Sequence, residues 1–292
     1  MKPHSNWRRW KWVQALKVMT VAQALSAALA LGLDRLDAQL LLLHALGKTE
    51  TQRAWLLAHD ADVLPATCET DFLALVRRRA TGEPLAYLSG HKEFFGLDLA
   101  VDARVLVPRP DTETLVDWAL EVLGDILQAS VIDLGTGSGA IALALKHTRP
   151  DLQVNAVDYS CDALAVASAN AQRLHLDVQW AQGSWLDNTP GRFLAIVSNP
   201  PYIAALDQHL DALTHEPLQA LASGPDGLDD IRHIIAQAPA HLLPGGWLLL
   251  EHGYDQAEAV RGLLLTAGFA DVQSRRDLSG IERCSGGRVS KA

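Results

Sequence analysis

Residues 131–140 decide the fold, and they read VIDLGTGSGA. Val131–Leu134 is a short, largely apolar run, which is typical of a buried strand. Glycines alternate with small polar residues directly after it, and Ala140–Lys146 then has the character of a helix. Glycine lets a backbone turn sharply and approach a ligand without an intervening side chain. The stretch therefore predicts a strand, a tight turn and a helix, with the turn facing a ligand.

The alternation of strand and helix continues from this stretch to the C-terminus. We expect further strands at 154–157, 178–181, 193–198, 247–250 and 272–276, and helices at 163–174, 231–242 and 260–267. Strands that alternate with helices predict an α/β fold with a parallel, doubly wound sheet. Ligands of such sheets bind beyond the carboxyl ends of the strands. The residues that follow Leu134, Asp158, Ala181, Ser198 and Glu251 are therefore expected on one rim.

The part of the chain before this sheet differs in character. Apolar residues recur at helical intervals from Thr20 to about Ala80, which predicts a small all-α domain. The stretch Tyr87–Val107 is rich in Phe, Leu and Val around two turn glycines, which predicts a β-hairpin. We expect a disordered leader at 1–18, a helical domain at 19–82, a linking hairpin at 83–108 and a catalytic domain at 109–292. Asp111 or Thr112 is expected to cap the helix after the hairpin.

Composition argues against several classes of protein. The 292 residues carry 34 Asp and Glu against 25 Lys and Arg, and this acidic balance disfavours a nucleic-acid backbone as the main partner. The apolar run at 18–33 is too short and too polar to span a membrane. Cys68, Cys161 and Cys284 form neither a disulfide framework nor a metal-ligand spacing, and the histidines form no ligand set. We expect a cytoplasmic protein with no metal, no membrane and no direct nucleic-acid partner.

Two carboxylates accompany the glycine loop and narrow the choice of ligand. With Ala140 the loop fits the G-x-G-x-x-A pattern of dinucleotide sites, although a tight turn without a ligand would also fit. Asp158 ends the next strand, where an acid can accept hydrogen bonds from both hydroxyls of a ribose; alternatively, it is a charge at a helix N-terminus. Asp133 would repel a pyrophosphate but suits a cationic amino group. This combination favours S-adenosylmethionine over NAD.

The tetrad Asn199-Pro200-Pro201-Tyr202 follows the strand at 193–198 and is the most specific feature of the chain. Two consecutive prolines restrict the backbone and remove two donors. The side-chain carbonyl of Asn199 and the backbone carbonyl of Pro200 can then accept both N–H groups of one planar –NH2, while Tyr202 offers a face to a flat substrate. Such acceptors orient a weak nucleophile and stabilise the positive charge that grows on it during methyl transfer. The purely structural alternative is an Asn-Pro turn that ends a buried strand.

On these motifs the chain, from about Thr20 to the C-terminus, resembles the bacterial release-factor glutamine N5-methyltransferases, the HemK/PrmC group. The segments that carry the resemblance are Gly90–Leu97, Pro108–Glu113, Asp133–Gly139, Asn199–Tyr202, Glu216-Pro217, Asp226–Leu228 and Glu251–Gly253 with Gln256. The resemblance implies a class I S-adenosylmethionine-dependent methyltransferase with a seven-stranded, mostly parallel sheet and an all-α N-terminal domain that helps to bind the substrate. It implies methylation of the glutamine side-chain amide in the Gly-Gly-Gln motif of class 1 peptide chain release factors, with S-adenosylhomocysteine as the product.

The resemblance also implies roles for individual positions. The cofactor-binding positions would be Asp133, Gly135, Thr136, Gly137, Ser138, Gly139, Asp158, Trp185 and Asn199. Asn199, Pro200, Pro201 and Tyr202 would hold the glutamine and form the catalytic site. Trp185 would lie beside the adenine, and relatives commonly carry an acid before it; here Ser184 occupies that position and Asp187 is the nearest acid. Arg109 and Glu113 are expected either near the cleft or paired with one another, bracing the hairpin.

Two other functions stay open. The exocyclic amines of adenine N6 and guanine N2 are also planar –NH2 groups, so the tetrad alone does not separate RNA or DNA from a glutamine substrate. A DNA enzyme would need a base-flipping pocket and usually a basic recognition region. A non-catalytic adaptor would bind the cofactor structurally and would bind its partner without transferring a methyl group.

Overall fold

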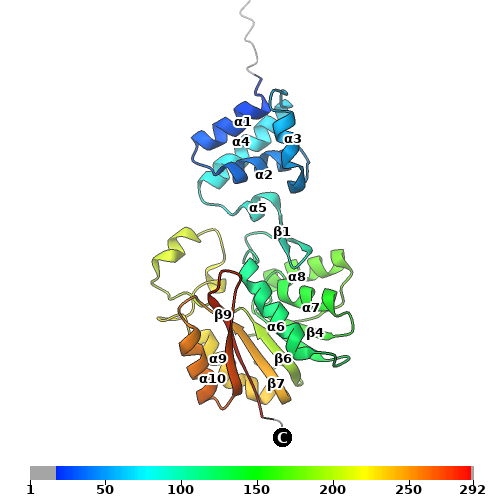
Figure 1. The fold of residues 1–292 in the computed structure, drawn as a ribbon, viewed down its shortest axis with the longest axis vertical. Coiled ribbons are helices and arrows are strands. Elements are labelled where there is room, and N and C mark those ends of the chain that lie inside the picture. Colours follow the sequence, from blue (N-terminus) through cyan, green and yellow to red (C-terminus); the bar gives the residue numbers. More distant parts are fainter. Residues whose placement is uncertain (1–17, 291–292) are drawn as a thin grey trace, which may run out of the picture. The chain divides into compact units, whose positions relative to one another are not determined.

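The computed structural model describes residues 18–290, so the predicted leader at 1–18 lies, apart from Val18, outside the described residues. The chain divides into two compact units, one ending at Thr81 and the other starting at Gly82. The first unit is helical and the second contains the sheet (Figure 1). The glycine loop and the tetrad both belong to the second unit.

Within the described residues the helical unit consists of α1 (Val21–Ala30), α2 (Arg35–Ala45), α3 (Arg53–Ala58) and α4 (Ala66–Ala80), with a 3-10 turn at Glu50–Gln52. Thr20 starts α1 because its side chain accepts from the Gln23 N–H while the Gln23 side chain accepts from the Thr20 N–H. Buried residues such as Leu42, Phe72 and Val76 form its core. The predicted all-α N-terminal domain is confirmed. No helix among residues 18–290 has the length and apolar character needed to cross a membrane.

A seven-stranded sheet forms the centre of the second unit. Its strands are β3 (Ser130–Leu134), β4 (Gln153–Asp158), β5 (Gln179–Gln182), β6 (Phe193–Ser198), β7 (Leu242–Glu251), β8 (Ala270–Arg276) and β9 (Glu282–Arg288). They lie in the order β5-β4-β3-β6-β7-β9-β8. Neighbours from β5 to β7 are parallel, whereas β9 is antiparallel to both β7 and β8. The predicted α/β class, with a mostly parallel sheet, is confirmed.

Helices cover both faces of this sheet (Figure 1). They are α6 (Glu113–Leu123), α7 (Ala140–Thr148), α8 (Cys161–Leu174), α9 (Asp229–His241) and α10 (Ala257–Thr266). Val131 of β3 belongs to the apolar cluster that contains residues of α6 and α7, while its neighbour Ile132 belongs to the cluster of α9 and α10. Successive side chains of a strand point to opposite faces, so a strand covered on both sides is apolar throughout. This double cover makes the sheet doubly wound.

The segment before α6 forms a short helix and a hairpin. α5 (Leu85–Ser89) precedes β1 (His91–Phe94) and β2 (Leu97–Ala100), which pair antiparallel. The prediction of extended structure from Tyr87 is wrong at its start, because Pro84 begins a helix and Gly90 ends it at a φ of 78°. Phe95 and Gly96, both with positive φ, make the turn between the two strands.

The hairpin packs against the rest of the sheet unit. Its residues Phe94 and Leu99 lie in the apolar cluster that includes α6 and α7. The Asn170 side chain of α8 accepts from the Ala100 N–H at 2.8 Å and donates to the Ala100 carbonyl at 3.0 Å. The same amide nitrogen donates to the Ser138 carbonyl at 3.0 Å. One fully buried side chain therefore ties the hairpin to the glycine loop.

The sequence pattern does not predict β9. Its centre, Ser285-Gly286-Gly287, lacks the branched and aromatic residues that favour strands. A Cβ atom on Gly286 would lie 2.6 Å from the Leu248 carbonyl oxygen and 3.0 Å from the Trp118 ring. Glycine is therefore needed where β9 approaches β7 and α6, and this close packing overrides the low strand propensity.

The start of α6 also differs from the prediction. A 3-10 turn at Pro110–Thr112 leads into the helix, and Thr112 occupies the cap position without a side-chain hydrogen bond to the helix. Its hydroxyl instead accepts from the Asn199 side-chain amide at 3.2 Å. Of the two predicted cap residues, Thr112 does occupy the cap position, but its hydroxyl makes a contact between distant segments instead of a capping hydrogen bond.

Candidate active site

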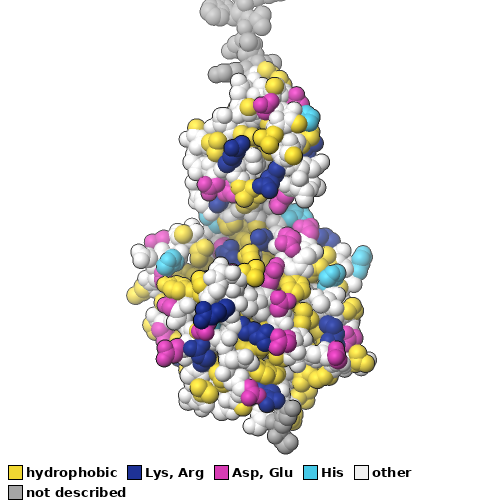
Figure 2. All heavy atoms as spheres, in the orientation of Figure 1, with side chains coloured by type: hydrophobic (Ala, Val, Ile, Leu, Met, Phe, Trp, Pro, Cys, Tyr) yellow, Lys and Arg dark blue, Asp and Glu magenta, His cyan; other side chains and the backbone are white. Residues whose placement is uncertain are grey.

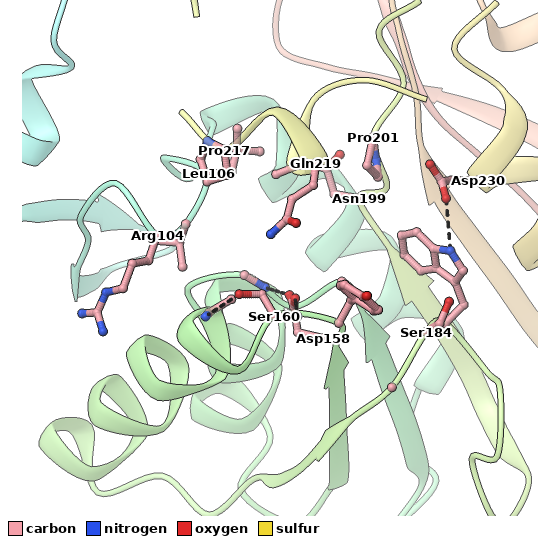
Figure 3. Close-up of a pocket in the computed structure, with 18 residues that line it drawn as sticks. Arg104, Leu106, Asp158, Ser160, Ser184, Asn199, Pro201, Pro217, Gln219 and Asp230 are labelled. Carbon is pink, nitrogen blue, oxygen red and sulfur yellow. Dashed lines mark hydrogen bonds between the residues drawn. The ribbon is translucent and has the colours of Figure 1, made fainter. Parts of the chain in front are cut away.

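The carboxyl ends of β3, β4 and β6 meet around a cavity of about 250 Å³ (Figure 3). The residues that line it come from seven short segments of the sheet unit: Arg104–Leu106, Gly135 with Gly137, Asp158–Ser160 with Ala163, Gly183–Trp185, Asn199 with Pro201, Pro217 with Gln219 and Ala220, and Asp230. The glycine loop, the acid after β4, the predicted tryptophan and the tetrad asparagine therefore share one cavity, as the rule for doubly wound sheets predicts.

The glycine loop contributes backbone rather than side chains. Gly135, Gly137 and Gly139 have φ values of 70°, 55° and 84°, which residues with a Cβ rarely adopt. Gly135 and Gly137 line the cavity. Thr136 and Ser138 are buried outside its lining. The loop thus presents a surface without side chains to whatever occupies the cavity.

Gly139, predicted to bind the cofactor, has a packing role instead of a place in the cavity lining. A Cβ atom there would lie 3.0 Å from Leu143 and 3.2 Å from Ala167. Both distances are shorter than ordinary van der Waals contacts. The third glycine therefore allows α7 and α8 to approach each other closely behind the loop.

Asp158 lies at the end of β4 and lines the cavity (Figure 3). Its Oδ2 accepts from the Gly137 N–H at 2.8 Å, and its Oδ1 accepts from the Ser160 N–H at 2.9 Å. Burial raises the pKa of this carboxyl, and the backbone N–H groups oppose the rise. Ser160 is itself the cap of α8, since its side chain accepts from the Ala163 N–H. Asp158 thus braces the glycine loop while remaining at the cavity wall.

Asp133 lies behind the loop, fully buried and outside the cavity lining. Its Oδ2 accepts from the Thr136 hydroxyl at 2.6 Å. Its Oδ1 is buried and has no hydrogen-bond partner among the described residues. Burial raises the pKa of this carboxyl to about 7, against the lowering effect of the Thr136 hydrogen bond. An unpaired carboxylate oxygen of this kind is a ready acceptor for a cationic group.

Trp185 forms a wall beside the loop. A Cβ atom on Gly135 would lie 3.1 Å from its ring, so only glycine allows this approach. Its indole nitrogen donates to the Asp230 carboxylate at 3.1 Å (Figure 3). Ser184 lines the cavity beside it, whereas the Asp187 carboxylate lies outside the lining and accepts from the Gln237 side chain at 2.5 Å. The nearest acid in the sequence is therefore engaged elsewhere.

The tetrad is divided between the cavity and the core. Asn199 and Pro201 line the cavity, whereas Pro200 is buried and Tyr202 packs at the edge of the apolar cluster of α9 and α10. Burial raises the pKa of the Tyr202 phenol to about 12. The Asn199 Nδ2 donates to Thr112, and its Oδ1 is buried without a partner among the described residues. The unsatisfied acceptor of the tetrad thus belongs to a residue that lines the cavity.

The predicted pairing of Arg109 with Glu113 is wrong. Arg109 instead forms an ion pair with the buried Glu216, with 2.5 Å between Nη2 and Oε1. Glu216 also accepts from the Val107 N–H at 3.1 Å. Glu113 accepts from the Phe95 N–H at 3.0 Å. Each residue thus braces the hairpin region separately, because residues more than a hundred positions away supply a better partner for the arginine.

Sequence reasoning missed part of the cavity wall. Leu106 and Gln219 come from loops without a recognisable motif, and only the tertiary structure brings them to the site. Tyr159 and Ser160 could have been found, because they directly follow a predicted strand end. No group of three or more His, Cys, Asp or Glu side chains in the part of the chain that the structure describes is placed to hold a metal ion.

Comparisons with known proteins agree with this geometry. The methyltransferase small domain family matches residues 112–225, and the PrmC N-terminal domain family matches residues 19–90. A release factor glutamine methyltransferase of Bordetella pertussis is 50% identical over 260 residues, which cover 88% of this chain and 95% of that protein. One from Xylella fastidiosa is 50% identical over 269 residues, which cover 91% and 97%.

Among solved structures, a methyltransferase from Pyrococcus furiosus is similar in fold, with a TM-score of 0.51 and 19% identity over 73% of this chain and 97% of that one. This likeness concerns the fold alone. The sequence relatives support membership of a family as well as a fold, because half of their residues are identical over nearly their whole length. The resemblance inferred from the motifs is confirmed, and the chain belongs to the family of release factor glutamine methyltransferases.

Proposed function

We propose that this chain transfers the methyl group of S-adenosylmethionine to the side-chain amide nitrogen of the glutamine in the Gly-Gly-Gln motif of class 1 peptide chain release factors. One observation carries the proposal. The Asn199 Oδ1 is a buried acceptor without a protein partner among the described residues, and Asn199 lines the same cavity as Gly135, Gly137 and Asp158. A planar –NH2 group beside a bound nucleoside would satisfy this acceptor.

The residues around the cavity fit S-adenosylmethionine. Asp158 is an acceptor for ribose hydroxyls, and the side-chain-free surface at Gly135 and Gly137 admits the nucleoside close to the backbone. Asp133 lies buried behind the loop and outside the lining, where its negative charge would favour a cationic amino group near Gly135 and disfavour a pyrophosphate. Trp185 and Ser184 would flank the bound molecule. When bound, S-adenosylmethionine supplies an electrophilic methyl group on a positively charged sulfur.

The chain itself has to orient and activate a poor nucleophile. An amide nitrogen is weak because its lone pair is delocalised into the carbonyl. Asn199 would accept one N–H of the glutamine amide, and the Pro200 carbonyl would accept the other, so that the nitrogen is held in one orientation. Both acceptors stabilise the positive charge that grows on the nitrogen, and each contact of this kind is worth about 2–4 kcal/mol in the transition state. Tyr202 and Pro201 would keep the tetrad rigid around this point.

The substrate class rests on the family. Relatives with 50% identity are named for release factor glutamine methylation. On the face in Figure 2, basic side chains of the sheet unit are interspersed with acidic ones, which favours a protein surface over a nucleic-acid backbone. We assign the helical unit, residues 19–82 in our sequence division, to binding the release factor, and we place the enzyme in the cytoplasm with its substrate.

The test is transfer of a labelled methyl group. The full chain is incubated with labelled S-adenosylmethionine and a purified class 1 release factor, and the products are located by mass spectrometry of peptides. We expect one added methyl group on the Gly-Gly-Gln glutamine, and none when that glutamine is replaced by asparagine. Label in ribosomal RNA or DNA but not in the release factor would overturn the substrate assignment.

A further inference from the structure

The side-chain amide of Asn199 is held by its nitrogen. Its Nδ2 donates to the Thr112 hydroxyl at 3.2 Å, while its Oδ1 has no partner among the described residues. The two ends of a carboxamide are nearly equal in size, so packing alone does not distinguish one orientation from the other. In the reversed orientation the amide would present N–H groups to an incoming –NH2, and two donors would face each other. Something in the protein has to prevent that reversal.

Thr112 selects the orientation only if its own proton is committed elsewhere. A hydroxyl has one proton and two acceptor lone pairs. If Thr112 donated its proton to Asn199, it would hold the carboxamide by its oxygen instead of its nitrogen. The Thr112 side chain is 4% exposed, so solvent does not provide a competing acceptor. A protein acceptor on the far side of the hydroxyl is therefore required.

Glu251 is that acceptor. It is the last residue of β7, the parallel neighbour of β6, and the pairing of Ser198 with Leu250 puts Asn199 and Glu251 at adjacent strand ends. Glu251 is 1% exposed, and its carboxyl lies close enough to the Thr112 hydroxyl and the Asn199 amide for both donors to lower its pKa. Burial raises the pKa of Glu251 to about 7, a rise that Asp111 reinforces and that Arg283 and hydrogen bonding from the Thr112 and Asn199 side chains oppose. A carboxylate only accepts hydrogen bonds, so it draws the Thr112 proton toward itself.

We propose that Thr112 and Glu251 are positioning residues which fix the Asn199 carboxamide with its nitrogen turned into the protein and its oxygen left for the substrate –NH2. The inference rests on the proposed function for the identity of that –NH2. It gives the Pro108–Glu113 segment a role in the reaction, because Thr112, the last residue of the 3-10 turn at Pro110–Thr112, contacts Asn199. In this arrangement the Asn199 Nδ2 donates to the Thr112 hydroxyl, and the Thr112 hydroxyl and the Asn199 amide both act as donors toward Glu251.

The test replaces the hydroxyl and keeps the shape of the side chain. In Thr112→Val we expect kcat for the release factor to fall about 10- to 100-fold, while the cofactor Kd and the melting temperature change little. Thr112→Ser restores the hydroxyl and should recover kcat to within about threefold of the wild type. Thr148→Val removes a hydroxyl that bonds only to a backbone carbonyl within α7, and it should have wild-type kinetics. Wild-type kcat in Thr112→Val, or an equal loss in Thr112→Ser, would overturn the proposal.

Glu251 is tested by Glu251→Gln, which has a similar shape but can donate to Thr112 and so permits the reversed direction. We expect kcat to fall about 3- to 10-fold with an unchanged cofactor Kd. A wild-type kcat in this variant would exclude Glu251 from the positioning role. Glu251→Gln also tests the proposal if Thr112→Val fails to fold.

A further measurement needs no methyl acceptor, so it separates this inference from the proposed function. The side-chain amide protons of Asn199 are identified by nuclear magnetic resonance as the signals lost in Asn199→Ala. Their exchange with water should speed up at least about tenfold in Thr112→Val, because the Nδ2 loses its partner. Unchanged exchange would contradict the positioning role. Absence of methyl transfer to the release factor by the wild type would instead contradict the proposed function.

Discussion

The two strand ends on either side of β6 are built alike. β3 ends near Asp133 and β7 ends at Glu251, and both carboxyl groups are buried with pKa values raised to about 7 by burial. Asp133 accepts from the Thr136 hydroxyl, and the Thr112 side chain lowers the pKa of Glu251 as a donor. Each keeps one oxygen without a partner among the described residues. The same combination of groups thus occurs on the glycine-loop side and on the tetrad side of the central strand.

The difference between them lies in how far the partners are apart in sequence. Asp133 and Thr136 are three residues apart, and their hydrogen bond braces the loop that contains them. Thr112 and Asn199 are 87 residues apart, and Glu251 comes from a third segment. The Asp133–Thr136 contact is therefore local, whereas the contacts of Asn199 form only when three segments are assembled. A motif search finds both residues of the first contact, whereas in the second it finds Asn199 but not the role of Thr112 or Glu251 beside it.

The largest effect on turnover should come from removing the Asn199 side chain. In Asn199→Ala we expect kcat to fall about 100- to 1,000-fold, because the oriented acceptor for the amide is lost from the transition state. The cofactor Kd should stay within about twofold of the wild type. Steady-state kinetics with the release factor and calorimetry with the cofactor measure the two quantities. A parallel loss of cofactor binding would show that Asn199 serves both sides.

Replacing Asp158 should weaken cofactor binding and affect turnover much less, the opposite of what we expect for Asn199. In Asp158→Ala we expect the cofactor Kd to rise about 10- to 100-fold, because a charged acceptor for the ligand is lost together with the brace on Gly137. Turnover at saturating cofactor should fall much less. Asp162→Ala, which removes an exposed carboxylate from the first turn of α8, is the matched control and should bind normally. Equal affinity of the two variants would exclude Asp158 from the binding site.

The buried carboxylate of Asp133 predicts a pH-dependent stability. Its folded pKa of about 7 is well above the usual value for Asp, so the stabilising contribution of this group is present below about pH 4 and is lost as the pH rises through 7. In the absence of cofactor, Asp133→Asn should therefore be more stable than the wild type by about 1–3 kcal/mol at pH 8. The advantage should shrink toward pH 4.5. Urea unfolding at both pH values measures it, and a constant difference would mean that the carboxyl does not titrate in this range.

The sheet and the cofactor side could be predicted because their signals are short in range. The strand at Phe193–Ser198 was predicted at its observed bounds, and the strands around Asp133 and Asp158 were predicted to within one residue. Apolar runs ending in glycine or aspartate are enough for such a prediction. Trp185, which the family resemblance puts beside the adenine, likewise lines the cavity.

The predictions that failed involve partners from distant segments. Thr112 looked like a helix cap because a threonine before an apolar helix usually is one, but Asn199 takes its hydroxyl. Pairing with Glu113 was one of two alternatives for Arg109, but Glu216 is the partner. Local preferences are weak, and a buried polar group pairs with whichever partner satisfies it in the folded chain.

By itself the amino-acid sequence determined the α/β architecture, the helical N-terminal unit, the glycine loop with its two acids, and the tetrad that identifies the family. The tertiary structure decided which atoms of these motifs stay without a partner: in Asn199, which lines the cavity, it is the oxygen rather than the nitrogen, and Asp133 lies behind the loop rather than in the lining. The physical reason is that strand and helix patterns arise from neighbouring residues, whereas the satisfaction of a buried polar atom depends on everything folded around it.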